Sequence, residues 1–257
     1  MCYDISFTVN MKKLTDYFPE LIWEEQMTMD FEEAVHIVGH GYGLHPIIYK
    51  NKDSGALHCK LMEWGCIPYY VKEASAFLRQ RASMLNARSE RILDDPKSYW
   101  HKIRNRRCLI PLNAFYEHRK VEGLKKKVPY IISLKDQPMM FLPGLYSVAK
   151  MADENGELQE VWTFTLITRM ANKLMAQIHN DGENTERMPL MLPFHLSEQW
   201  VNEELNEAAY REILNYEMPS GNLDFHTVYT IRSAKPRPDE KAKNEWYDWG
   251  ELPPVLL

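Results

Sequence analysis

A cysteine stands directly behind the first methionine, in the opening stretch MCYDISFTVN. Because residue 2 is small, we expect Met1 to be removed, which leaves an α-amine and a thiol on adjacent carbons of Cys2. An α-amine has a pKa of about 7.7–8.0, well below the value of about 10.4 for lysine, so more of it is neutral at pH 7 and able to attack an aldehyde. The neighbouring thiol can then close a five-membered thiazolidine ring. Alternatively, the thiolate attacks an acyl group with the α-amine as its base, and sequence position alone leaves both reactions open.

Three further polar residues stand at the ends of apolar segments: Asn86 in LNARSE, Glu117 in RRCLIPLNAFYEH, and His179 in IH…RMPLML. Each also has an ordinary structural explanation. Asn86 suits a turn or cap, Glu117 an exposed strand position, and His179 the C-terminal end of a helix. Taken singly, these residues therefore do not identify a site.

The charge is unevenly distributed along a chain whose formal net charge is -5. Residues 16–33 carry seven acids and no lysine or arginine, whereas residues 79–107 carry seven arginines and two lysines against three acids. This asymmetry is compatible with a basic groove for nucleic acid on an acidic protein, and equally with a solvated helical face.

The four cysteines are too sparse for a disulfide framework in a chain of 257 residues. We expect Cys59, Cys66 and Cys108 to be buried thiols, and their spacing matches no metal-ligand motif. No apolar run is long enough to span a membrane, and the first residues lack the pattern of a secretion signal, which favours a cytoplasmic location.

The hydrophobic patterns predict strands and helices that interleave without the regular alternation or the glycine-rich phosphate loop of a doubly wound sheet. We therefore expect an α+β fold with mainly antiparallel strands, as one domain over residues 1–233 followed by a polar tail over 234–257 that either packs on the domain or trails from it. Strands are predicted at 2–9, 45–50, 56–65, in two parts of 106–119, and at 129–134, 161–168, 189–193 and 225–231. Helices are predicted at 19–37, 70–81, 97–106, 170–179 and as a pair within 197–214.

Taken in order, these segments resemble the SOS-response-associated peptidase (SRAP) family over nearly the whole chain. The shared features are the Met-Cys start, W-G-x-I-P, N-A-R-x-E, R-R-C-L-I-P followed by F-Y-E, a T-x-A-N-like strand end and H…R-M-P. The resemblance implies a pseudobarrel of strands with peripheral helices, and recognition of single-stranded DNA that carries an abasic site. It also implies a thiazolidine cross-link between the processed cysteine and the ring-opened sugar. We expect a monomer without metal or cofactor that is associated with the nucleoid when bound to DNA.

The resemblance assigns a role to each residue of the candidate site. Cys2 becomes the cross-linking nucleophile, and Asn86 holds the N-terminal residue and the opened sugar. Glu117 acts as general acid and base, and His179 lies near the phosphate or the imine.

A second set of residues is expected to bind DNA. Arg88 and Arg187 would contact phosphates. Trp64, Pro68 and Tyr69 would support unpaired bases or stack on them. The set is completed by Arg81, Arg106 and Thr168.

The chain departs from the family pattern in three places. Tyr3 and Asp4 replace a glycine and an arginine after Cys2, His118 replaces a tryptophan after F-Y-E, and seven residues with three acids separate His179 from Arg187. An aspartate near a phosphate would repel it, so the DNA affinity or the preferred DNA structure is expected to differ. Two other functions stay open: a cysteine peptidase with an N-terminal nucleophile, including self-removal of Met1, and a non-covalent module for single-stranded DNA.

Overall fold

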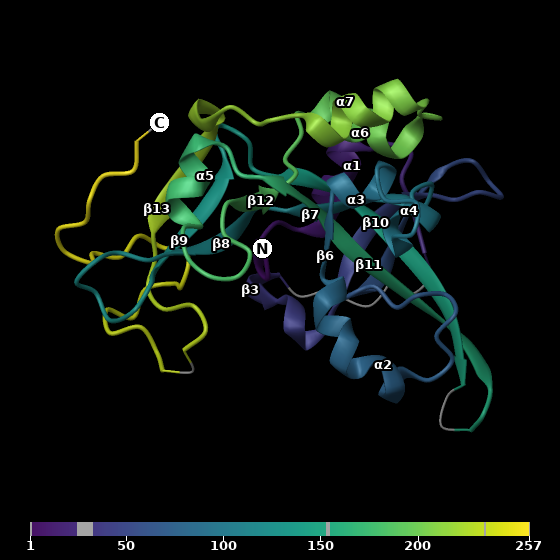
Figure 1. Ribbon diagram of the computed structural model, residues 1–257, viewed down its shortest axis with the longest axis horizontal. Coiled ribbons are helices and arrows are strands. Elements are labelled where there is room, and N and C mark those ends of the chain that lie inside the picture. Colours follow the sequence, from purple (N-terminus) through teal and green to yellow (C-terminus); the bar gives the residue numbers. More distant parts are fainter. Residues whose placement is uncertain (1, 25–32, 153–154, 234, 257) are drawn as a thin grey trace.

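The computed structural model describes residues 2–24, 33–152, 155–233 and 235–256, and its strands form two sheets (Figure 1). The smaller sheet has five antiparallel strands in the order β13-β9-β8-β1-β3. Its members are β1 (Asp4–Phe7), β3 (Ala34–Val38), β8 (Ala114–Arg119), β9 (Val128–Leu134) and β13 (Leu223–Thr227).

The larger sheet closes on itself. Its strands follow the order β12-β11-β10-β7-β4-β5-β2, and a parallel pairing of β11 with β5 joins the ring β11-β10-β7-β4-β5. This ring confirms the predicted pseudobarrel, in which most pairings are antiparallel. The members are β2 (Ile22–Trp23), β4 (Leu44–Lys50), β5 (Leu57–Trp64), β6 (Asn86–Arg88), β7 (Arg107–Leu112), β10 (Met140–Ala152), β11 (Leu158–Met170) and β12 (Arg187–Pro189).

Short helices surround the sheets. Helix α6 packs on β7 and β10, while α2 lies on the opposite side of the molecule (Figure 1). The helices are α1 (Leu14–Tyr17), α2 (Ala74–Arg81), α3 (Glu90–Leu93), α4 (Tyr99–Lys102), α5 (Lys173–Ile178), α6 (Phe194–Asn202) and α7 (Glu207–Asn215). Single 3-10 turns are η1 (Met11–Lys13), η3 (Gly39–Gly41), η4 (Ala82–Met84) and η5 (Ser220–Asn222).

The acidic helix predicted at 19–37 is wrong where the structure describes this segment. Residues 22–23 and 34–38 are strands, and residues 25–32 lie outside the described part of the chain. Strand β3 is rich in β-branched residues and pairs with β1, so tertiary pairing outweighs the helical spacing of the acids.

Other predicted boundaries shift. The helix predicted at 97–106 is a single turn, and the strand predicted at 189–193 lies at Arg187–Pro189 instead. The long strand β10 was not predicted, because it contains Pro143 and Gly144, which are typical of turns. Gly144 is required by close packing: a Cβ there would lie 2.4 Å from Cδ1 of Ile110 and 2.6 Å from the carbonyl oxygen of Thr165.

The four cysteines, all in the described part of the chain, are free and buried, as predicted for Cys59, Cys66 and Cys108. In the described ranges, no helix has the length and apolar character that a membrane crossing requires.

Candidate active site

Strand β1 carries the start of the chain into the smaller sheet, between β8 and the edge strand β3. Ile5 pairs with Phe115 of β8, and the same antiparallel register extended by two residues aligns Tyr3 with Glu117. On the other side, the backbone nitrogen of Gly39 donates to the carbonyl oxygen of Tyr3 over 2.8 Å. Residues 2–7 are therefore held between two strands, and Cys2 lies next to the carboxylate that the sequence singled out.

Asn86 fixes Cys2 from the larger sheet. Strand β6 pairs with β11 through Asn86 and Leu166, and Nδ2 of Asn86 donates to the carbonyl oxygen of Cys2 over 3.0 Å. The other amide atom, Oδ1, is buried and has no hydrogen-bond partner among the described residues. The asparagine thus has an acceptor to spare beside residue 2.

The Cys2 side chain is fully buried, and its Sγ lies 3.8 Å from the carbonyl oxygen of Asp4. Burial raises the pKa of the Cys2 thiol well above its usual value, and the negative charges of Glu117 and Asp4 raise it further. The thiol is therefore protonated at neutral pH in this structure.

Glu117 and His179 meet at the end of α5, with 3.9 Å between Oε2 and Nε2. Nδ1 of His179 donates to the carbonyl oxygen of Arg187 over 2.9 Å, which sets the orientation of the ring. Burial raises the pKa of Glu117 to about 7 and lowers that of His179 to about 4. At neutral pH the histidine is uncharged, and the glutamic acid is populated in both of its forms, as suits a group that takes up and returns a proton.

A pocket of about 350 Å³ opens over this pair. Its walls come from the residues after Cys2, from β8, and from the turn that follows His179. Cys2 directly precedes the lining residue Tyr3, but neither Cys2 nor Asn86 is among the residues that line the pocket. The lining residues are Tyr3, Asp4, Glu117, His118, Lys127, His179, Asp181, Gly182, Glu183, Asn184 and Arg232.

Asp4 is neutralised by a residue that the sequence analysis did not find. Arg232 donates to both carboxylate oxygens of Asp4, over 2.9 and 2.6 Å, and Nε2 of His36 lies 2.8 Å from Oδ1. Although burial alone favours the neutral acid, these hydrogen bonds hold the pKa of Asp4 below its usual value. The expected repulsion between Asp4 and DNA phosphate is thereby offset by a paired cation at the same pocket.

Three of the predicted DNA-binding residues are accessible. Tyr69 is 44% exposed, Arg88 is exposed, and Arg106 is half-buried, with its guanidinium 5.9 Å from the centre of the Tyr69 ring. The remaining five residues of the set are buried: Trp64, Pro68, Arg81, Thr168 and Arg187.

Those five residues serve as internal supports in this structure. Trp64 donates from its indole nitrogen to the carbonyl oxygen of Leu85 and stacks with Phe164. Arg187 pairs through both terminal nitrogens with Glu90 and also donates to the carbonyl oxygen of Thr168.

Arg81 likewise pairs with Glu63 and donates to the carbonyl oxygen of Gly65. DNA contact by Arg81 or Arg187 stays a prediction, and it requires each arginine first to leave its carboxylate.

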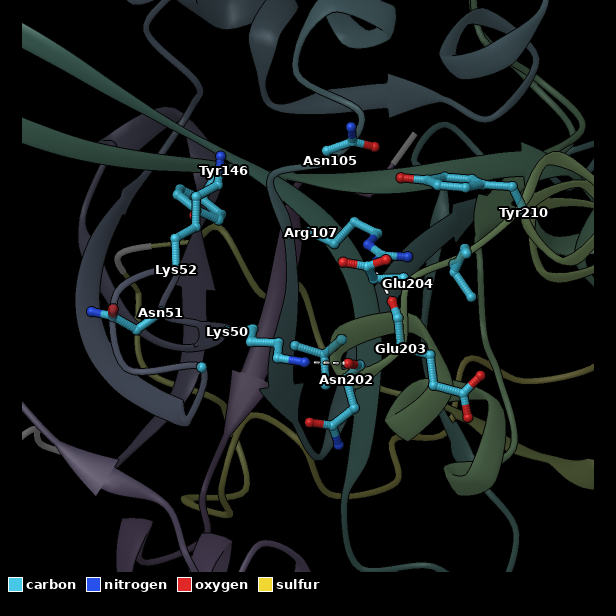
Figure 2. Close-up of a pocket in the computed structure, with 13 residues that line it drawn as sticks. Lys50, Asn51, Lys52, Asn105, Arg107, Tyr146, Asn202, Glu203, Glu204 and Tyr210 are labelled. Atoms are coloured by element: carbon cyan, nitrogen blue, oxygen red, sulfur yellow. Dashed lines mark hydrogen bonds between the residues drawn. The ribbon is translucent and has the colours of Figure 1, made fainter.

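A more spacious pocket lies elsewhere. It has about 560 Å³ between the end of β4, the start of β7 and the α6–α7 connection, and Figure 2 shows Arg107 at its centre. Its lysines and arginine share the space with Glu203 and Glu204, and it contains none of the predicted site residues. Within the described ranges, no group of three His, Cys, Asp or Glu side chains is placed to hold a metal ion.

Comparison with known proteins gives one consistent result. The family model described as SOS response associated peptidase (SRAP) matches residues 1–231. The abasic site processing protein YoqW of Bacillus subtilis is 28% identical over 170 residues, which cover 66% of this chain and 69% of the relative. The abasic site processing protein YMR114C of Saccharomyces cerevisiae is 30% identical over 154 residues, which cover 59% of this chain and 36% of the relative.

Solved structures share the fold. A protein of Bacteroides thetaiotaomicron superposes with a TM-score of 0.76 at 25% identity, over 95% of this chain and 97% of the other. A protein of Bordetella bronchiseptica superposes with a TM-score of 0.68 at 19% identity, over 89% of this chain and 100% of the other, which supports the fold alone.

Proposed function

Because the chain belongs to the SOS response associated peptidase family, we propose that it acts in the DNA damage response by capturing abasic sites in single-stranded DNA through Cys2. Relatives in bacteria, yeast and vertebrates are named abasic site processing proteins. The observation that carries the proposal is the hydrogen bond from Asn86 to the carbonyl oxygen of Cys2, the residue next to Tyr3 in the lining of the pocket that contains Glu117 and His179. The protein would act as a cytoplasmic monomer that joins the nucleoid when it binds DNA.

The reaction needs no oxidant or cofactor. After Met1 is removed, the neutral α-amine of Cys2 adds to the C1 aldehyde of the ring-opened deoxyribose, and loss of water from the carbinolamine gives an imine. The thiol then adds across the C=N bond, with its sulfur bonded to C1 and its proton transferred to nitrogen. One water molecule is released overall, and a thiazolidine remains.

Glu117 is suited to move the protons of these steps. With a pKa raised by burial to about 7, it can donate a proton to the sugar ring oxygen as the hemiacetal opens and accept one from the amine. His179 is uncharged near neutral pH because burial lowers its pKa to about 4, and its Nδ1–H is used by the Arg187 carbonyl, so its Nε2 would accept a hydrogen bond from the carbinolamine. A bond from Nε2 to a flanking phosphate would require the ring to take up a proton.

DNA contact is assigned to the accessible part of the predicted set. Arg88 would bind a phosphate, and Tyr69 with Arg106 would form a platform on which an unpaired base stacks. Trp64, Pro68, Arg81, Thr168 and Arg187 are proposed to hold these elements in place.

Self-removal of Met1 is a second proposed activity of the same residues. The Glu117 carboxylate acts electrostatically on the Cys2 thiol and titrates near pH 7, so it can take the thiol proton as sulfur attacks the preceding carbonyl. The peptide bond between Met1 and Cys2 breaks as the Cys2 nitrogen takes the proton from Glu117, which leaves the methionyl group on sulfur as a thioester. Hydrolysis of this thioester consumes one water, releases methionine and restores the thiol.

Intact-mass measurement before and after addition of an abasic oligonucleotide tests both proposals. We expect loss of one methionine from the purified protein, and then a mass increase equal to the oligonucleotide minus one water. Cys2→Ala should form no denaturation-resistant complex, whereas Cys66→Ala, a matched change of a buried thiol, should form it normally. An oligonucleotide with a tetrahydrofuran site lacks the aldehyde and should bind without cross-linking. A denaturation-resistant complex with Cys2→Ala rejects the assigned nucleophile.

A further inference from the structure

The last described part of the chain, residues 245–256, contacts both elements that carry the acid–base pair. We call this segment the C-terminal clasp. It follows the end of the family match at residue 231 and folds back over the smaller sheet. In Figure 1 the yellow trace passes β13 and β9 and ends near α5.

The clasp is first anchored on β13 and the core. The backbone nitrogen of Tyr247 donates to the carbonyl oxygen of Thr227 over 2.9 Å, and the indole nitrogen of Trp249 donates to that of Val228 over 2.9 Å. Trp249, Leu252 and Val255 pack against the hydrophobic cluster that contains Cys2. The segment is therefore part of the packed domain and not a trailing end.

Its far end is bonded to helix α5. The side-chain amide of Gln177 donates to the carbonyl oxygen of Leu256 over 2.7 Å and accepts from the Leu256 backbone nitrogen over 2.9 Å. Gln177 also donates to the carbonyl oxygen of Lys173 within the helix, and it stands two residues before His179, near the C-terminal end of a helix of only six residues. So short a helix depends on outside contacts for its position.

The same stretch of the clasp is bonded to strand β8. Arg119 stands two residues after Glu117, so the two side chains leave the strand on the same side. Arg119 is 9% exposed, and its guanidinium donates to the carbonyl oxygens of Pro253 over 2.6 Å and Pro254 over 3.5 Å. In the described ranges no carboxylate pairs with it, so these carbonyls replace the water that the buried cation has lost.

Residues 253–256 thus bridge β8 and α5, in addition to the two hydrogen bonds that join Lys120 and Asn180 just beyond these elements. We propose that the clasp positions Glu117 relative to His179, with Gln177 and Arg119 as positioning residues for abasic-site capture. This inference rests on the proposed function, because the cross-linking rate can be measured only if the protein captures abasic sites. Effects on rate are expected to be large, because a displacement of about 1 Å in a catalytic group can cost about a hundredfold.

The test uses full-length Gln177→Ala and Arg119→Met proteins with Gln199→Ala as a control, since Gln199 lies on the remote helix α6. We measure the cross-linking rate at saturating abasic oligonucleotide, the dissociation constant for the tetrahydrofuran oligonucleotide, and the unfolding temperature. Gln177→Ala should slow cross-linking about tenfold with unchanged affinity and an unfolding temperature within a few degrees of wild type. Gln177→Glu keeps the acceptor but not the donor, so its rate should be intermediate.

An NMR titration of His179 gives a readout that needs no DNA. Its pKa, about 4 in the intact site, should rise toward 6.5 in Gln177→Ala as the ring gains access to water. Wild-type rates and an unchanged His179 titration in Gln177→Ala and Arg119→Met would overturn the inference. So would a parallel loss of affinity and unfolding temperature, which indicates a general folding role. If wild-type protein forms no cross-link, the proposed function fails, and the His179 titration alone decides whether the clasp positions this residue.

Discussion

The side chain of Asn86 and the main chain of Cys2 are joined by a 3.0 Å hydrogen bond across 84 residues of sequence. The bond connects the two sheets, because Asn86 belongs to β6 of the larger sheet and Cys2 precedes β1 of the smaller one. It leaves Oδ1 of Asn86 buried without a partner among the described residues. We expect this oxygen to accept from the freed α-amine or from a sugar hydroxyl.

Asn86→Ala should therefore weaken both the fold and the capture reaction. Loss of a buried hydrogen bond is expected to lower the free energy of unfolding by about 1–2 kcal/mol, measured by urea titration. The cross-linking rate should fall at least about tenfold, because the N-terminal residue is no longer held at the pocket. Asn105→Ala, at an exposed asparagine, is the control and should match wild type in both measurements. An unchanged rate in Asn86→Ala would remove the asparagine from the mechanism.

Glu117 and His179 should make contributions of opposite sign to the pH dependence of the free energy of unfolding. Glu117 has a pKa raised by burial to about 7, so the folded state retains a proton that the unfolded state loses above pH 4.5, and stability falls as pH rises from 4.5 to 7. His179 has a pKa lowered by burial to about 4, so the unfolded state binds the extra proton, and stability rises from pH 4 to 6.5. The two effects largely cancel in wild type.

Removing one partner exposes the contribution of the other. In Glu117→Gln the free energy of unfolding should rise between pH 4 and 6.5, and in His179→Gln it should fall between pH 4.5 and 7, by roughly 3 kcal/mol in each case. Urea unfolding at half-unit pH intervals measures both slopes. Equal pH profiles in the two variants would show that these residues are not the groups with displaced pKa values.

Strands could be predicted from the sequence where the local pattern of side chains favours the same structure as the pairing with neighbouring strands. The turn-forming NKDSG at 51–55 predicted β5 as the partner of β4, and the β-forming residues of 161–168 predicted the centre of β11; both strands form. Strand β10 was not predicted, because the reason for a glycine at position 144 is close packing against Ile110 and Thr165, which are distant in sequence. Local pattern cannot register such a contact.

The site residues also fall into those that local motifs predict and those that depend on contacts distant in sequence. Cys2, Asn86, Glu117 and His179 were predicted from ordered motifs, and the structure brings these four together. Arg232 was not predicted, since its link to Asp4 spans 228 residues and no motif contains it. Accessibility could not be predicted either, because sequence alone does not distinguish a buried, ion-paired arginine such as Arg187 from an exposed one such as Arg88.

The pair of Asp4 and Arg232 should contribute measurably to stability. Arg232→Gln leaves the Asp4 carboxylate, whose side chain is 4% exposed, with His36 as its remaining partner. We expect a loss of about 2 kcal/mol at pH 7, less than for a fully buried pair because the Arg232 side chain is 47% exposed. The pKa of Asp4 is lowered, so this contribution is present above 3.8 and disappears as pH falls through the folded-state value.

Urea unfolding of Arg232→Gln at pH 7 and at pH 3 measures this difference, which should shrink at the lower pH. Arg91→Gln is the control, because Arg91 forms an exposed pair with Asp95 on the surface and should cost at most about 0.5 kcal/mol. Equal losses for the two variants would mean that Arg232 does not stabilise the start of the chain.

Arg88 and Arg187, both assigned to phosphate binding by the sequence motifs, should differ when each is changed to glutamine. Arg88 is exposed and bonded only to the side chain of Asn184 among the described residues, so it is free to exchange that partner for a phosphate. Arg88→Gln should reduce affinity for a tetrahydrofuran oligonucleotide several-fold and lower the magnitude of the slope of log K against log salt by about 0.7, with an unchanged free energy of unfolding.

Arg187 has a side chain only 6% exposed and paired with Glu90, so Arg187→Gln should cost about 1–3 kcal/mol of unfolding free energy. Its salt slope should stay at the wild-type value, since no phosphate contact is lost. A reduced slope in Arg187→Gln with full stability would instead place this guanidinium on the DNA, and it would require Glu90 to give up its partner when the strand binds.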